Sequence, residues 1–254
     1  MNNPDGIASG LRWSFVSQAF RVGCQVIGLI IFARYLSAED FGLVSMATLV
    51  SGIAFFFRDF GTVAAVIQKP KLNDDLLSSI FWFNLLVGFT VAIIIVFIAP
   101  IIAGLFDEPR LTFVLWAIAG AFPIGATGLV HQAILEREKK FKPVAIVEVA
   151  SVLLGLICGV LAANYGVGAY SLVAQSIVTA LVTSMGMWRI SIWRPKIGVS
   201  IAELRSILGF SSNLLGFNFI NYFARNADGF LIGRLLGAND LGVYTIAYNR
   251  KSVV

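Results

Sequence analysis

Residues 33–42 read ARYLSAEDFG, and residues 233–242 read GRLLGANDLG. At an ungapped offset of 200 positions, Arg, Leu, Ala, Asp and Gly coincide at 34/234, 36/236, 38/238, 40/240 and 42/242. Each copy closes one long apolar run and opens the next, and six expected membrane spans separate the copies. Six is an even number, so both copies have the same orientation. The spacing predicts two lobes related by an axis along the membrane normal. The alternative is that both copies are generic interfacial turns.

The composition around this repeat is that of a membrane protein. The 254 residues contain 19 Lys+Arg and 14 Asp+Glu, so that 13% are charged and 58% are hydrophobic, whereas roughly 25% of an ordinary soluble domain is charged. Disordered chains are poor in apolar residues. The two cysteines, Cys24 and Cys158, lie in apolar runs, which argues against a disulfide scaffold. The predicted fold class is an all-α polytopic membrane protein, because helices satisfy their own backbone hydrogen bonds in lipid.

Apolar runs and helix breakers divide the chain into seven spans and the beginning of an eighth near Leu241. The expected spans are 11–36, 41–67, 76–106, 110–135, 143–164, 167–190 and 204–236. Residues 1–200 then form a complete six-helix N-terminal lobe. Residues 201–254 form the incomplete start of a C-terminal lobe, so we expect the chain to be truncated at its C-terminus.

Basic residues are distributed unevenly between the loops. The N-terminal flank and the loops after the second, fourth and sixth spans contain eleven, whereas the other loops contain three, namely Arg34, Arg110 and Arg234. The eleven are Arg12, Lys69, Lys71, Arg137, Lys139, Lys140, Lys142, Arg189, Arg194, Lys196 and Arg205. Cytoplasmic loops are enriched in Lys and Arg, so the N-terminus is predicted to be cytoplasmic. The same rule explains the net charge of +5, and no nucleic-acid partner is expected.

Polar residues form matched stripes in the first and seventh spans. Steps of three or four residues place each stripe on one helical face. The stripes comprise Ser14, Gln18, Arg21 and Gln25 in the first span, and Asn218, Asn221, Arg225 and Asp228 in the seventh. Subtracting 200 from the second set gives positions 18, 21, 25 and 28, so the two faces are equivalent. They are predicted to line a central polar cavity; the alternative is hydrogen bonding between helices inside the bundle.

Other ionisable and polar groups lie in the apolar runs. Arg58 and Asp59, in the second span, either serve the substrate or form an ion pair at a helix break before Gly61. Asp59 or Asp228 is a candidate for coupling transport to a cation. A weaker polar stripe on the sixth span consists of Gln175, Thr179 and Thr183.

Three further residues in the spans have an expected local position or effect. Pro123, between Gly120 and Gly125, is expected to kink the 110–135 span, because proline removes a backbone hydrogen bond. His131, near the cytoplasmic end of the same span, is expected to be interfacial and is assigned no role. Glu148 lies near the start of the fifth span and is expected to snorkel toward the membrane surface.

The sequence contains no Walker A motif, HExxH motif, nucleophile elbow or Cys/His cluster with metal-ligand spacing. We therefore expect no enzyme, no metal site and no cofactor. Transport is the function that this pattern favours.

Several stretches carry a resemblance to a known family. They are residues 33–42, 58–68, 81–86, 134–141, 193–195 and 231–238. In their order and spacing the chain resembles the polysaccharide transporter family of the MATE/oligosaccharide-lipid flippase superfamily, and in particular flippases of the O-antigen and colanic-acid exporter type. The likeness extends to about Asn249, and the final five residues depart from the pattern.

The resemblance implies two six-helix lobes around a cavity that opens alternately to each side of the bacterial inner membrane. It implies an undecaprenyl-pyrophosphate-linked oligosaccharide as cargo, with membrane lipid, a polysaccharide polymerase and export machinery as further partners. Arg21 and Arg225 are then expected to contact the anionic head group, with Arg58 a weaker candidate. Gln18, Gln25, Asn218 and Asn221 are expected to bind sugar hydroxyls.

Three alternatives remain at this point. A drug/cation antiporter of the same fold would favour acidic and aromatic groups at its site, against which Arg21 and Arg225 argue. A membrane enzyme acting on lipid-linked glycans would need a large periplasmic loop with catalytic groups. An inactive flippase fragment is the third, because one lobe alone has no opposite wall for its cavity.

Overall fold

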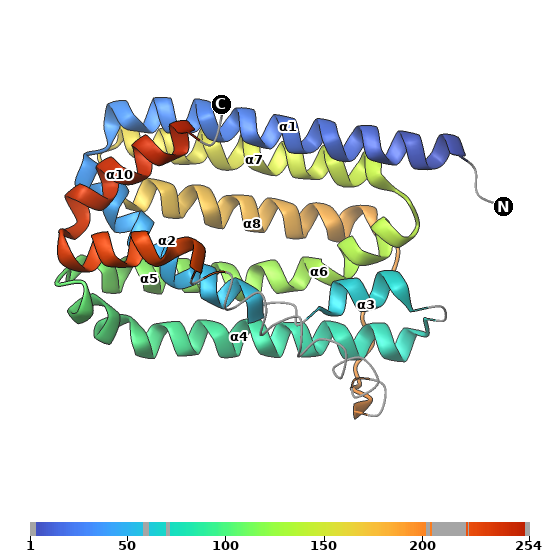
Figure 1. The fold of residues 1–254 in the computed structure, drawn as a ribbon. Helices are drawn as coiled ribbons and strands as arrows, with labels where there is room; N and C mark the ends of the chain where they lie inside the picture. Colours follow the sequence, from blue (N-terminus) through green and yellow to red (C-terminus); the bar gives the residue numbers. More distant parts are fainter. Residues whose placement is uncertain are drawn as a thin grey trace.

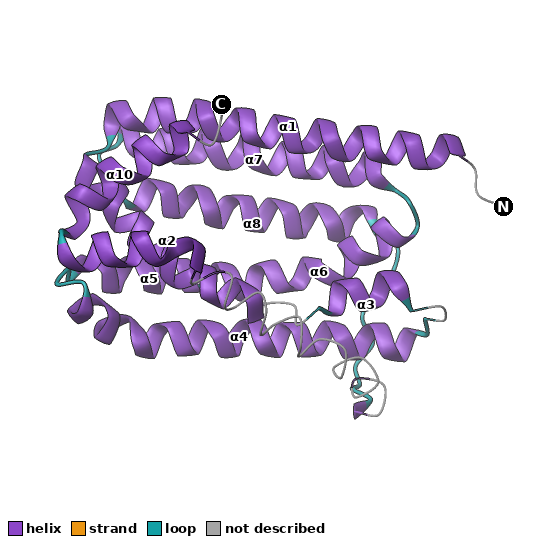
Figure 2. Ribbon diagram, in the orientation of Figure 1, coloured by secondary structure: helices purple, strands orange, loops and turns teal. Residues whose placement is uncertain are grey.

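The computed structural model describes residues 4–57, 61–69, 72–201, 204, 222 and 224–251, and every regular element among them is a helix (Figure 2). The helices are α1 (Pro4–Tyr35), α2 (Ala38–Phe57), α3 (Thr62–Gln68), α4 (Asp74–Leu105), α5 (Arg110–Ala119), α6 (Ala121–Arg137), α7 (Phe141–Asn164), α8 (Tyr170–Ile190) and α10 (Gly237–Lys251). Residues 224–235 are also helical. This confirms the all-α fold class.

Five segments of the described chain are long and apolar enough to cross a membrane. They are Phe15–Tyr35, Asp74–Leu105, Arg110–Arg137, Phe141–Asn164 and Tyr170–Ile190. Each coincides with an expected span, and the chain is a multi-pass membrane protein. The expected span 41–67 is instead two helices, α2 and α3, with Gly61 between them at a φ of 71°. An α-helix cannot continue through a left-handed residue.

The long helices lie in a row in the order α1, α7, α8, α6 and α4, and α2 crosses this row against α5 and α10 (Figure 1). The N-terminus, α3 and the α6–α7 connection lie at one end of the bundle. The connections α1–α2, α4–α5 and α7–α8 lie at the opposite end. Successive long helices therefore traverse the bundle in alternating directions, as spans of a membrane protein do.

Local sequence explains where several helices begin and end. Ser37 and Asp40 form a capping box at the start of α2, because each side chain accepts a hydrogen bond from the other residue's backbone N–H. Asn73 caps α4 by accepting a hydrogen bond from the Leu76 N–H at 2.8 Å. The fourth span is interrupted between α5 and α6. Pro123 has no N–H to donate to the Ala119 carbonyl, so the expected disturbance of this span is confirmed.

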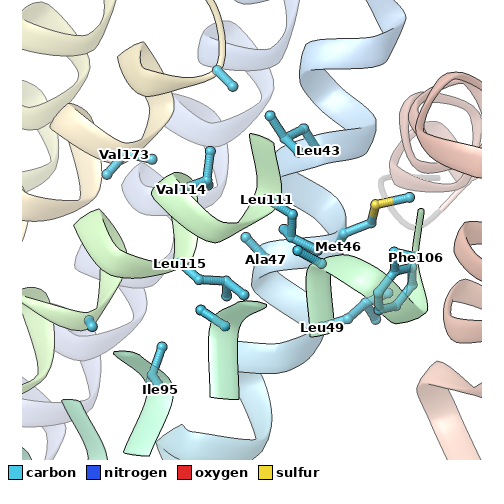
Figure 3. Close-up of a cluster of buried hydrophobic side chains, with 14 of the residues drawn as sticks. Leu43, Met46, Ala47, Leu49, Ile95, Phe106, Leu111, Val114, Leu115 and Val173 are labelled. Carbon is cyan, nitrogen blue, oxygen red and sulfur yellow. The ribbon is translucent and has the colours of Figure 1, made fainter. Parts of the chain in front are cut away.

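The largest hydrophobic cluster lies where α2, α4, α5 and α8 meet (Figure 3). Its best-buried members include Leu43, Met46, Leu111, Val114 and Leu115, all at most 2% exposed. On the outer side of α4, large apolar residues are exposed instead. The exposed fractions of Phe97 and Ile101 reach 76% and 65%. Lipid is the solvent that matches such an apolar exterior.

The two repeated segments pack reciprocally against one another through α2 and α10. A Cβ added to Gly42 would lie 1.6 Å from the Ala238 carbonyl oxygen, and a Cβ added to Gly242 would lie 1.8 Å from the Ala38 carbonyl oxygen. Only glycine permits backbones to approach this closely. Ala38 and Gly42 thus contact the matching Ala238 and Gly242, and the positions shared by the two copies meet at one place.

Candidate functional site

The first of two polar cavities lies between α2, α10 and residues 222–229, and we name it the interface cavity. It has a volume of about 440 Å³. Its polar lining residues are Ser45, Thr48, Tyr222, Arg225, Asn226, Asp228, Tyr244 and Thr245. The expected N-terminal lobe supplies one wall through α2, and the segment after residue 201 supplies the other. Arg225 and Asp228, both predicted site residues, lie in this wall.

The charged groups of the interface cavity differ in how they are engaged. Asp228 accepts a hydrogen bond from the Tyr244 hydroxyl and another from the Gly229 N–H at 2.9 Å. The Tyr222 hydroxyl donates to the Leu49 carbonyl at 2.8 Å, which ties this segment to α2. Arg225 has no hydrogen bond or ion pair with any part of the chain that the structure describes. Among the described residues, its guanidinium is therefore a cation without a charged partner, beside the cavity.

Arg21 lies on α1 outside both cavities. Its Nη2 donates to Gln18 Oε1 at 2.8 Å and lies 3.7 Å from Glu148 Oε2 on α7. The side chains of Arg21 and Glu148 are 38% and 16% exposed. Glu148 is thus a partner of Arg21 across the helix interface. The structure does not bring Arg21 together with Arg225 in either cavity.

The second cavity lies inside the helix row between α1, α2, α6 and α8, and we name it the inner cavity. It has a volume of about 460 Å³. Its polar lining residues are Gln25, Thr48, Ser51, Gln132, Gln175, Ser176, Thr179, Thr183 and Ser184. All of its lining residues are uncharged. The weaker polar stripe of the sixth span faces this cavity together with Gln25 from the first.

Close packing between α7 and α8 fixes the direction of that stripe. A Cβ added to Gly155 would lie 2.0 Å from Thr179 Oγ1, and one added to Gly159 would lie 2.9 Å from Gln175 Cβ. The absence of a Cβ at these two glycines therefore allows α8 to pack closely against α7. The remaining side of the stripe is presented to α2 and α6, where the inner cavity lies.

The two cavities share part of their walls. Val44 and Thr48, one helical turn apart on α2, line both. The inner cavity lies on the side of these residues that faces α6 and α8, and the interface cavity lies on the side that faces α10. The two cavities therefore adjoin along one turn of α2.

Sequence reasoning missed several lining residues and misplaced one. Thr48 and Ser51 follow Ser45 at steps of three residues on α2, a helical stripe that could have marked them. Gln132 reaches the cavity from another helix, and no stripe marks it. His131 is completely buried rather than interfacial, between Phe81 and Trp188, and neither of its ring nitrogens has a hydrogen-bond partner in the described structure. The remaining predicted site residues, Arg58, Asp59, Asn218 and Asn221, lie outside the described residues.

Comparison with known proteins bears directly on this site. A family model described as "Polysaccharide biosynthesis protein" matches residues 31–254, which include every lining residue of the interface cavity except Leu29. The chain belongs to this family. The resemblance inferred from the repeat and its flanking stretches is thereby confirmed, and no solved structure matches the chain.

Three relatives in the polysaccharide biosynthesis family illustrate the match. The lipopolysaccharide biosynthesis protein WzxC of Escherichia coli is 26% identical, over 95% of this chain and 49% of its own length. The succinoglycan biosynthesis transport protein ExoT of Rhizobium meliloti is 28% identical, over 99% and 51%. The teichuronic acid biosynthesis protein TuaB of Bacillus subtilis is 25% identical, over 95% and 50%. The chain spans about half the length of these relatives.

Proposed function

We propose that the protein containing this chain moves lipid-linked oligosaccharide precursors from the cytoplasmic to the periplasmic leaflet of the bacterial inner membrane. The observation that carries the proposal is the guanidinium of Arg225, which lies beside the interface cavity without a charged partner among the described residues, in a family of polysaccharide biosynthesis proteins. The cargo is an undecaprenyl-pyrophosphate-linked oligosaccharide. Residues 1–200 act as one lobe, residues 201–254 begin the second, and the protein transports rather than catalyses.

The chemistry of the interface cavity suits an anionic head group. A guanidinium is permanently charged and offers planar hydrogen-bond donors to phosphate oxygens. At bilayer depth an unpaired arginine is costly, which favours a role in binding an anion. The polyprenyl tail stays in the lipid between the helices, so only the head group has to cross. The Asp228 carboxylate accepts a hydrogen bond from the Tyr244 hydroxyl. Arg225 lines the same cavity and would repel a cationic drug, so cation antiport is not favoured.

The proposed orientation places the N-terminus, α3 and the α6–α7 connection in the cytoplasm. Most of the basic loop residues belong to that end of the bundle, and the positive-inside rule assigns it to the cytoplasmic side. The head group then enters from the end at which the polymer repeat unit is synthesised. A polysaccharide polymerase and export machinery would receive it on the opposite side.

The proposal is tested by replacing Arg225. In a bacterial strain that lacks its own transporter for the lipid-linked repeat unit, the protein containing this chain should restore surface polysaccharide. Arg225→Ala should lower the export rate by about tenfold or more, because a hydrogen bond to a charged group contributes about 1.5–3 kcal/mol. Arg234→Ala is the matched control, since Arg234 pairs with Asp107 at 2.5 Å outside the cavity. Normal export by Arg225→Ala at equal protein level would contradict the proposal.

A further inference from the structure

The inner cavity has the chemistry of a site for a neutral, hydroxyl-rich ligand. The described residues that line it are all uncharged, and its polar groups are amides and hydroxyls that both donate and accept hydrogen bonds. Its volume of about 460 Å³ falls within the roughly 300–1,000 Å³ of small-molecule sites. A phosphate would find no compensating cation there, whereas sugar hydroxyls would find partners on three sides.

Two of the lining amides have no partner of their own. The side chains of Gln25 on α1 and Gln175 on α8 make no hydrogen bond within the described part of the chain. Gln25 is exposed and Gln175 is half-buried, so both amides are accessible to a ligand in the cavity. The two amides come from helices on different sides of the cavity, so one ligand between them would satisfy both.

The position of the inner cavity beside the interface cavity matches the covalent structure of the proposed cargo. In a pyrophosphate-linked oligosaccharide the first sugar is bonded directly to the phosphate. Val44 and Thr48 on α2 line both cavities, so the cavities adjoin along this turn of the helix. A cargo whose pyrophosphate is bound by Arg225 in one cavity therefore has an uncharged polar cavity next to it for its sugars.

From this geometry we infer that the inner cavity is a glycosyl subsite, which holds a neutral sugar residue while Arg225 holds the phosphates. The inference rests on the proposed function, because it takes the anionic part of the same cargo to bind in the interface cavity. Gln25, Gln175 and Thr183 bind the hydroxyls. Specificity for the repeat unit then resides in the uncharged lining of the first lobe.

The test measures protection of single cysteines by two lipids. In a background with Cys24→Ala and Cys158→Ala, the full chain receives either Ser176→Cys in the inner cavity or Thr245→Cys in the interface cavity. Membranes are treated with a maleimide alone, with undecaprenyl pyrophosphate, or with undecaprenyl pyrophosphate bearing an oligosaccharide repeat unit extracted from the host. Lys139→Cys, in the α6–α7 connection, reports labelling that neither lipid should affect.

At ten times the dissociation constant, a bound ligand should slow labelling of a covered thiol by about tenfold. We expect both lipids to protect the Thr245→Cys thiol, and only the sugar-bearing lipid to protect the Ser176→Cys thiol. Adding Gln175→Leu and Thr183→Val should abolish protection at Ser176→Cys and leave protection at Thr245→Cys. Thr90→Val on α4 is the matched control and should change neither.

The outcomes separate the two ideas. If both lipids protect Thr245→Cys and neither protects Ser176→Cys, or both protect it equally, the glycosyl subsite is wrong and the proposed function stands. If neither lipid protects either thiol, the proposed function is wrong and the subsite falls with it. Protection of Ser176→Cys that survives Gln175→Leu and Thr183→Val would also overturn the subsite.

Discussion

Arg21 was expected from its spacing to face a central cavity, and the structure gives it a carboxylate neighbour instead. Arg21 Nη2 lies 3.7 Å from Glu148 Oε2, and Gln18 accepts a hydrogen bond from the same nitrogen. A positive charge that is already paired with Glu148 is a weaker candidate for the head group than Arg225. The two arginines therefore have different expected effects when they are replaced.

A double-mutant cycle should measure the pair. We expect Arg21→Ala and Glu148→Ala to be coupled by about 0.5–1 kcal/mol, since Arg21 is partly exposed and its contact with Glu148 is long. The measurement is thermal unfolding in detergent. The exchange Arg21→Glu with Glu148→Arg should recover most of the lost stability and retain export. Loss of export in a stable exchange variant would return Arg21 to the head-group site.

Lys196 provides a prediction for pH. Its Nζ lies 2.9 Å from Asp74 Oδ2, and the hydrogen bond to that carboxylate raises the pKa of the amine above its ordinary value. Because the pKa is higher in the folded state, the contribution to stability is fully present below the unfolded pKa of about 10.4. It is lost as the pH rises through the folded pKa. We expect melting temperatures above pH 10 to fall more steeply for wild type than for Lys196→Met.

At the scale of helices, hydropathy located the five apolar segments within a few residues, because length and apolarity alone decide whether a helix suits the bilayer. The break between α2 and α3 was expected only as one of two alternatives for Arg58 and Asp59, within a single span 41–67. It depends on the positive φ of Gly61, and an apolar pattern carries no information about one backbone dihedral. Pro123 was predictive because the missing N–H acts within its own helix.

Any side chain added at Gly42 or Gly242 should disrupt the contact between α2 and α10 and lower the stability of the protein. Gly42→Ala and Gly242→Ala each place a Cβ against a backbone carbonyl, so we expect each to destabilise the protein by about 1–3 kcal/mol. Gly104→Ala on α4 is the control. Nothing lies within 4 Å of its added Cβ, and alanine favours a helix by about 1 kcal/mol over glycine. Thermal unfolding in detergent measures the stability of the three variants. Equal stability of all three would show that α2 and α10 do not make this close backbone contact.

At the scale of the whole molecule, periodicity identified part of the site and tertiary packing determined the rest. Gln25 and the stripe of Gln175, Thr179 and Thr183 were recognisable because helical spacing aligns them. Gln132 reaches the same cavity from α6 without any marked neighbour. Its role depends on how four helices converge, which spacing along one helix cannot reveal. The matched stripes likewise did not predict that Arg21 pairs with Glu148, because Glu148 lies on α7, outside both stripes.

The orientation of the molecule is testable with reporters at opposite ends of the bundle. A fluorescent protein that folds only in the cytoplasm should be bright when inserted between Glu138 and Lys139. It should be dark when inserted between Gly166 and Val167, in the α7–α8 connection at the other end. An alkaline phosphatase fusion at each site should show the reverse pattern. Phosphatase activity at the α6–α7 connection would invert the proposed direction of transport.

The glycine contact also sets an order of events during synthesis. Ala38 and Gly42 enter the membrane while residues 238–242 have yet to be translated, so for most of the time at the ribosome this part of α2 lacks its partner. The close approach of Gly42 to the Ala238 carbonyl, and of Gly242 to the Ala38 carbonyl, can form only after residue 242 has been synthesised.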